Sequence, residues 1–169
     1  IHIMIERQPM WLSFLKGELD QTDIPKDSFD GAVDRSTLQL KPEIKNKGIV
    51  LTSDQSSTQW WYGFNMKDPI VGKNLNLRKA IAYAYDSEKD IELFGMGALQ
   101  ANQIIPPTTQ GHNPKLPPRK KSLQLAKEYL AKAGYPGGKG LSPINIDTEG
   151  SSRHRQWAEF FKQEMAAIG

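Results

Sequence analysis

The stretch that decides the fold is residues 59–90, QWWYGFNMKDPIVGKNLNLRKAIAYAYDSEKD. In its first part, residues 60–66, aromatic and apolar residues occupy odd as well as even positions. In a strand these positions point to opposite faces, so the pattern predicts a central strand that is covered on both faces. After a polar break, Asn74 is placed to cap a helix, and Asp86 is placed to cap a second one with Glu88 near its positive end. The first helix carries one apolar stripe with i, i+3, i+4, i+7 spacing: Leu77, Ala80, Ile81 and Ala84.

The composition is that of an ordinary globular domain. The chain has 169 residues, of which 38% are hydrophobic and 24% charged, with a net charge of +3. No run of about 18 apolar residues is present, so we expect no membrane insertion. The absence of Cys excludes disulfides and thiolate metal sites. The three His residues lack metal-ligand spacing, so we expect no metal and no cofactor: His2, His112 and His154.

Strand and helix signals alternate along the rest of the chain. Strands are predicted where β-branched or apolar residues alternate with polar ones: Ile1–Ile5, 49–52 and 144–146. Helices are predicted at Gln8–Lys16, around Asp27 as a cap, at Leu40–Lys47, from Ser122 to Ala133 and from Ser151 or Ser152 onward, with Gly17, Gly48 and Gly134 as stops. The last helix is expected to carry four apolar residues on one face: Trp157, Phe161, Met165 and Ile168. The pattern predicts one α/β domain over residues 1–169, a mixed sheet with helices packed on it.

Three segments resemble the extracellular solute-binding proteins of family 5, the receptors of peptide and nickel ABC importers. The helix 75–86, the loop 97–114 and the phrase AKEYLAKAGYPGGKG at 126–140 carry the resemblance. The matching positions are Arg78, Ala80, Ile81, Ala84 and Asp86; Gly97, Ala98, Ile104, Pro106, Pro107, Gly111 and Pro114; and Lys127, Leu130, Ala133, Gly134, Tyr135, Pro136 and Gly138. His112 stands where the family more often has an aromatic residue, and Ser122 where it more often has Asp.

The resemblance implies one lobe of a two-lobed periplasmic binding protein, type II-like and truncated here. The chain begins inside an apparent strand and ends inside an apparent helix, so we expect a piece of a longer protein. The parent protein would capture a peptide, or another small solute such as nickel, outside the cytoplasmic membrane. Its partners would be the second lobe of the same protein and an ABC permease, and it would catalyse no reaction.

The ligand-binding candidates are three aromatic residues and two loop residues: Trp60, Trp61, Tyr62, Gln103 and Pro106. Aromatic rings offer large, stiff contact surfaces for peptide or apolar ligands. The central-strand prediction favours a core position for the three rings, with one face of the strand left as a candidate wall of the cleft. The Pro-rich loop around Gln103 lines the cleft in one interpretation and crosses the surface in the other.

Two other classes of function lack a motif. An enzyme or accessory domain would use carboxylates such as Asp86 and Glu88, but their spacing is explained by a helix cap, a first-turn charge and a solvated face. A nucleic-acid binder would use the basic run Arg119–Lys121, which is typical of a solvated loop, so no nucleic acid is expected. The glycines at 134–140 close a helix and lack the spacing of a phosphate-binding loop.

Overall fold

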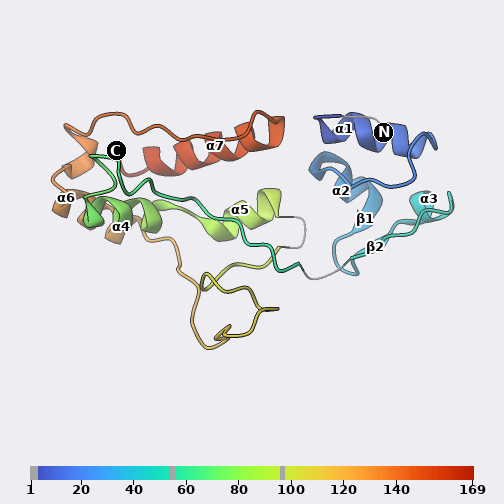
Figure 1. Cartoon of the computed structure of the whole chain (residues 1–169), viewed down its shortest axis with the longest axis horizontal. Helices are drawn as coiled ribbons and strands as arrows, with labels where there is room; N and C mark the ends of the chain where they lie inside the picture. Colours follow the sequence, from blue (N-terminus) through green and yellow to red (C-terminus); the bar gives the residue numbers. More distant parts are fainter. Residues whose placement is uncertain (1–3, 54–55, 96–97) are drawn as a thin grey trace. The chain divides into compact units, whose positions relative to one another are not determined.

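The computed structural model describes residues 4–53, 56–95 and 98–169. The chain divides into two compact units, residues 1–55 and residues 56–169, and each is described by itself. The larger unit holds the fold-deciding stretch itself, with α4 (Leu75–Ala84) and the start of α5 (Ser87–Phe94) inside it (Figure 1). The prediction of a single domain over the whole chain stays a prediction.

The smaller unit has three helices and two short strands among its described residues. Its elements are α1 (Arg7–Leu15), α2 (Lys26–Ala32), β1 (Val33–Asp34), β2 (Gln39–Leu40) and α3 (Pro42–Lys45). The two strands pair antiparallel, with Val33 opposite Leu40. Trp11 of α1, Ala32 and Val33 are buried together and form a small core. The helix predicted at Gln8–Lys16 is therefore confirmed as α1, and Gly17 ends it with a φ of +78°.

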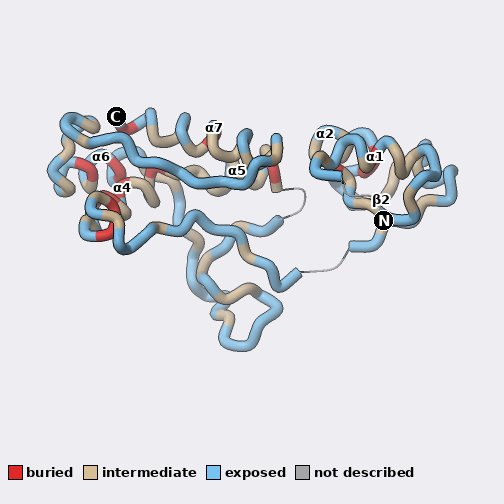
Figure 2. Tube along the Cα trace, turned by 45° about the horizontal axis from the view of Figure 1, so that its top comes forward, coloured by how far each residue is buried: buried red, intermediate tan, exposed pale blue. Residues whose placement is uncertain are grey.

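The larger unit packs its helices around α4. Its elements are α4 (Leu75–Ala84), α5 (Ser87–Phe94), α6 (Leu123–Lys132), the 3-10 turn η1 (Pro136–Gly138) and α7 (Ser152–Ala166). Leu77, Ala80 and Ala84 of α4 are buried against Ala126 and Leu130 of α6. Figure 2 shows buried stretches, in red, on both α4 and α6. The apolar stripes read from the sequence thus form the core.

Four helix starts follow the capping rule. The side chains of Asn74, Asp86, Ser122 and Ser151 accept the backbone N–H three residues ahead, at 3.0, 2.9, 3.3 and 3.4 Å. These caps confirm the predicted starts of α4, α5, α6 and α7. Each bond satisfies a backbone donor that the first helical turn leaves open.

The end of α6 confirms the predicted stop at Gly134. This residue has a φ of +95°, which glycine adopts without a Cβ clash. The Gly134 N–H donates to Ala131 O and the Tyr135 N–H donates to Leu130 O, each at 3.0 Å, the two bonds of a Schellman motif. Tyr135 thereby folds back onto the α4–α6 core.

The predicted mixed sheet is not formed among the described residues, whose only strands are β1 and β2. The chain at 49–52, 60–66 and 144–146 belongs to no strand ladder. A strand needs hydrogen bonds from a neighbouring strand, and no described segment supplies them here. Residues 1–3 of the predicted first strand, and Gly97 of the family pattern, lie outside the described residues.

Two smaller predictions were also wrong. The helix expected at Leu40–Lys47 is only the four-residue α3, although Gly48 does follow it with a φ of +76°. Asp27 lies in the first turn of α2, and its cap is Pro25. The apolar face predicted for the last helix is confirmed at Ile168, which is buried, and at Met165, which packs against the α4–α6 core. The ring that is buried in α7 is the neighbouring Phe160, which contacts Phe94 and Tyr85.

Candidate functional site

The aromatic segment, residues 60–62, lies before α4 in chain that forms neither helix nor strand. Trp60 and Trp61 are 71% and 72% exposed, and Tyr62 is 38% exposed. The expectation that they are core residues of a central strand is therefore wrong in this structure. Large exposed aromatic rings that stand next to one another are a common feature of binding surfaces.

Two rings of the aromatic segment rest on a support of other rings. Trp60 lies against Trp157 of α7, with centroids 5.9 Å apart. Tyr62 lies edge-on to Tyr85 at 5.2 Å and against Phe161 at 4.6 Å. The segment thus has a fixed position although it belongs to no sheet.

The loop around Gln103 is held to the chain just before the aromatic segment. Gln59 Nε2 donates to Gln103 O at 2.7 Å, and the hydroxyl oxygens of Ser57 and Thr108 lie 2.9 Å apart. The side-chain amide of Gln103 binds within the loop. Its Nε2 donates to Asn113 O and lies within hydrogen-bond distance of His112 Nδ1. Gln103 is therefore placed as a brace between the loop and the segment.

Pro106 is half-buried in the same loop, and its carbonyl accepts the Thr109 N–H at 3.0 Å. That bond closes a tight turn, which suits the fixed φ of proline. The structure therefore brings the loop that carries Gln103 and Pro106 close to the start of the aromatic segment. Gln103 makes the bond to that start, and Pro106 shapes the loop through its own turn.

A half-buried carboxylate, Asp90 of α5, lies behind the aromatic segment. Burial raises the pKa of Asp90, and the Tyr85 hydroxyl, the Trp157 indole and the Arg153 guanidinium lower it in part. Burial also raises the pKa of both Tyr62 and Tyr85. The sequence pattern of acids along this helix did not predict a half-buried carboxylate at Asp90. Its position four residues before the buried Phe94, on the same face of α5, was the available signal.

The other acids proposed for catalysis have structural partners or lie on the surface. Asp86 caps α5, and its backbone N–H donates to Glu164 at 3.0 Å. Lys121 of the basic run lies 2.6 Å from the same Glu164 carboxylate and 3.8 Å from Asp86. Glu88 is exposed. The arrangement ties α5, α7 and the chain before α6 together, and it offers no pair of free carboxylates at these positions.

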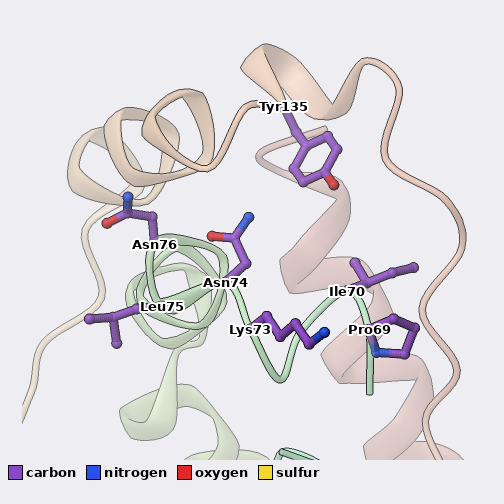
Figure 3. A pocket seen from close by; sticks show the side chains of 7 residues that line it. All are labelled: Pro69, Ile70, Lys73, Asn74, Leu75, Asn76 and Tyr135. Atoms are coloured by element: carbon purple, nitrogen blue, oxygen red, sulfur yellow. The ribbon is translucent and has the colours of Figure 1, made fainter. Parts of the chain in front are cut away.

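An open hollow of ≈ 520 Å³ lies between the start of α4 and Tyr135. Figure 3 shows the Asn74 side chain on the side of α4 that faces Tyr135, and the Asn76 side chain next to it on the same helix start. Both amides are occupied, since Asn74 Nδ2 donates to Ala133 O and Asn76 Nδ2 donates to Lys132 O. The hollow therefore marks the joint between α4 and the end of α6, and it has few polar groups left to orient a ligand.

Two further features bear on the class of site. Across the described ranges, no group of three or more His, Asp or Glu side chains is placed to hold a metal ion. None of the helices in the described part of the chain is both long and apolar enough to cross a membrane.

Comparison with known sequences decides the family. The sequence model described as "Bacterial extracellular solute-binding proteins, family 5 Middle" matches residues 1–169. The chain belongs to this family. One relative by sequence similarity is Heme-binding protein A of Haemophilus influenzae, 36% identical over 112 residues. That match covers 65% of this chain and 19% of the relative.

A solved structure confirms the fold of the family 5 chain. A periplasmic oligopeptide-binding protein of an oligopeptide ABC transporter from Borrelia burgdorferi matches with a TM-score of 0.69 at 19% identity. The match covers 96% of this chain and 30% of that protein. The α/β binding-protein lobe expected from the resemblance is thus shown, although several of its predicted strands remain unpaired here. The chain spans less than a third of the length of these two proteins.

Proposed function

We propose that this chain is part of an extracytoplasmic receptor that captures peptides, or another small solute, and delivers them to an ABC permease. Membership of family 5 supports a solute-binding role without catalysis. The solved neighbour is an oligopeptide-binding protein and the sequence relative is a heme-binding protein, so both ligand classes enter the test. The location outside the cytoplasmic membrane, the second lobe and the permease belong to the same proposal.

The observation that carries the proposal is the exposure of the aromatic segment. Trp60 and Trp61 present most of their surface to solvent, while Trp157 and the braced loop hold the segment in place. Rigid aromatic surface binds peptide side chains or a flat macrocycle at low cost in conformational entropy. We propose this segment as one wall of the ligand site, with Gln103 and Pro106 in the loop behind it.

The test uses the full-length protein that contains this chain. Its melting temperature is measured with di- to pentapeptides, hemin and Ni²⁺, because a ligand that binds only the folded state raises stability by about 2.7 kcal/mol at 100 times its Kd. We expect a peptide to raise the melting temperature. A stabilisation by hemin alone would identify the other ligand class, and no stabilisation by any of the three would contradict the proposal.

The variants Trp60→Ala and Met66→Ala separate the aromatic segment from general surface effects. Met66 lies a few residues along the same chain and is 58% exposed, so it is a matched apolar control. We expect Trp60→Ala to weaken binding of the stabilising ligand at least tenfold and Met66→Ala to change it less than twofold. Equal effects of both variants would remove the aromatic segment from the site.

A further inference from the structure

One carboxylate, Asp90, lies next to two of the rings that support the aromatic segment, Tyr85 and Trp157. Asp90 lies beside the Tyr85 hydroxyl and the Trp157 indole, and these are the rings that contact Tyr62 and Trp60. Tyr85 is the C-cap of α4, Asp90 belongs to α5, and Trp157 belongs to α7. Three different elements thus meet at one acidic group.

The polar atoms of this cluster are complementary and enclosed. Tyr85 Oη, Asp90 Oδ1 and Trp157 Nε1 are buried from solvent, and none completes a hydrogen bond of ordinary geometry in this structure. The Tyr85 hydroxyl and the Trp157 indole N–H are donors, and Asp90 Oδ1 is an acceptor. The two donors therefore lie next to an acceptor without forming a hydrogen bond to it. Buried polar groups are normally paired, and small ring rotations would pair these.

Arg153 of α7 is the positively charged residue that acts on Asp90. Its guanidinium lies 4.7 Å from the centre of the Trp157 ring, and Nη2 donates to Phe94 O at 3.0 Å. The positive charge of Arg153 favours the ionised form of the carboxylate, and burial opposes it. Besides Arg153, the titratable groups near Asp90 are the hydroxyls of Tyr62 and Tyr85.

We propose that Asp90 is a positioning residue for the binding surface: through Tyr85 and Trp157 it sets the orientation of Tyr62 and Trp60. The inference rests on the proposed role of the aromatic segment in ligand binding. Asp90 itself touches no ligand. The buried Asp90 Oδ1 is the acceptor nearest to the donors of both supporting rings, and these rings contact Tyr62 and Trp60. Protonation of Asp90 removes one acceptor and alters both supports together.

The test is ¹⁹F NMR of the intact protein labelled with 5-fluorotryptophan, and it needs no ligand. Trp→Phe substitutions assign the resonances of Trp60, Trp61 and Trp157. We expect Trp60 and Trp157 to shift together as Asp90 titrates, and Trp61, which has no ring contact with this cluster, to stay unmoved. The ring of His154 lies 5.2 Å from that of Trp157, so the titration is repeated in a His154→Gln background.

Variants of Asp90 separate positioning from stability. Asp90→Asn keeps an acceptor oxygen and cannot titrate, so we expect near wild-type Trp60 and Trp157 resonances with no pH-dependent shift. Asp90→Ala removes the acceptor and is expected to move both resonances. Glu92→Ala is the control, since Glu92 lies exposed on the same helix in an ion pair with Lys89.

The inference is overturned if Trp157 titrates with Asp90 while Trp60 does not, because Asp90 would then support α7 alone. It is also overturned if Asp90→Asn leaves the titration of Trp60 unchanged. If Asp90→Ala does not fold, the pH titration of the Trp60 and Trp157 resonances in Asp90→Asn and in the wild type still tests the inference. Failure of every ligand in the thermal test would leave these resonances unaffected, so the two proposals fail separately.

Discussion

The neighbouring residues Trp61 and Tyr62 are predicted to differ sharply in what they contribute to stability. Tyr62 is 38% exposed and packs on Tyr85 and Phe161, whereas Trp61 is 72% exposed and stacks on no ring of the described chain. Covering about 60% of a ring side chain of about 200 Å² removes about 120 Å² from water, which is worth about 3 kcal/mol. A compact unfolded chain reduces this to about 2 kcal/mol, and the two ring contacts add about 1 kcal/mol or more.

We therefore expect Tyr62→Ala to lower the free energy of unfolding by about 3 kcal/mol and Trp61→Ala by less than about 1 kcal/mol. Urea unfolding of the 169-residue chain, followed by circular dichroism at 222 nm, measures both values. Ligand binding by the full-length protein is expected to show a different order, with Trp61→Ala weakening it while the fold stays intact. Equal losses of stability for the two variants would refute the reasoning, because Trp61 would then be as buried as Tyr62.

Two further predictions concern the turn before α4 and the charge of Asp90. Gly72→Ala should lower the free energy of unfolding by about 2 kcal/mol or more, because a Cβ there would meet the carbonyl oxygens of Met66 and Asp68, the second at 2.5 Å. Gly31→Ala in α2, where a Cβ meets nothing within 4 Å, should instead be neutral or stabilise by about 0.5–1 kcal/mol, and urea unfolding compares the two. Burial raises the folded-state pKa of Asp90, so its contribution to stability falls as pH rises from its usual pKa through the raised one. The stability advantage of Asp90→Asn over wild type should be greatest at neutral pH and vanish near pH 4, and an advantage that grows on acidification would contradict this.

The helices were predictable because their signals are local. Asn74, Asp86, Ser122 and Ser151 each cap a helix through a bond to a residue three positions ahead, which the sequence displays directly. The stop at Gly134 is equally local. The family pattern added the α/β lobe fold, which the structural match confirms.

The strands and the surroundings of Asp90 depend on distant parts of the chain. A strand at 60–66 exists only where another strand pairs with it, and alternation alone cannot show that partner. Asp90 resembles its exposed neighbours in sequence, and only the packing of α7 against α5 buries it beside Trp157. For the site, the sequence identified the aromatic segment as a candidate and placed it in the core, whereas two of its rings are largely exposed.

The most direct test of the central claim is hydroxyl-radical footprinting of the full-length protein with and without a stabilising peptide. If the aromatic segment is a wall of the solute site, oxidation of Trp60 and Trp61 falls severalfold on binding, while the exposed Met66 and Leu75 remain as reactive as before. A peptide that raises the melting temperature and leaves Trp60 and Trp61 fully reactive would contradict the account.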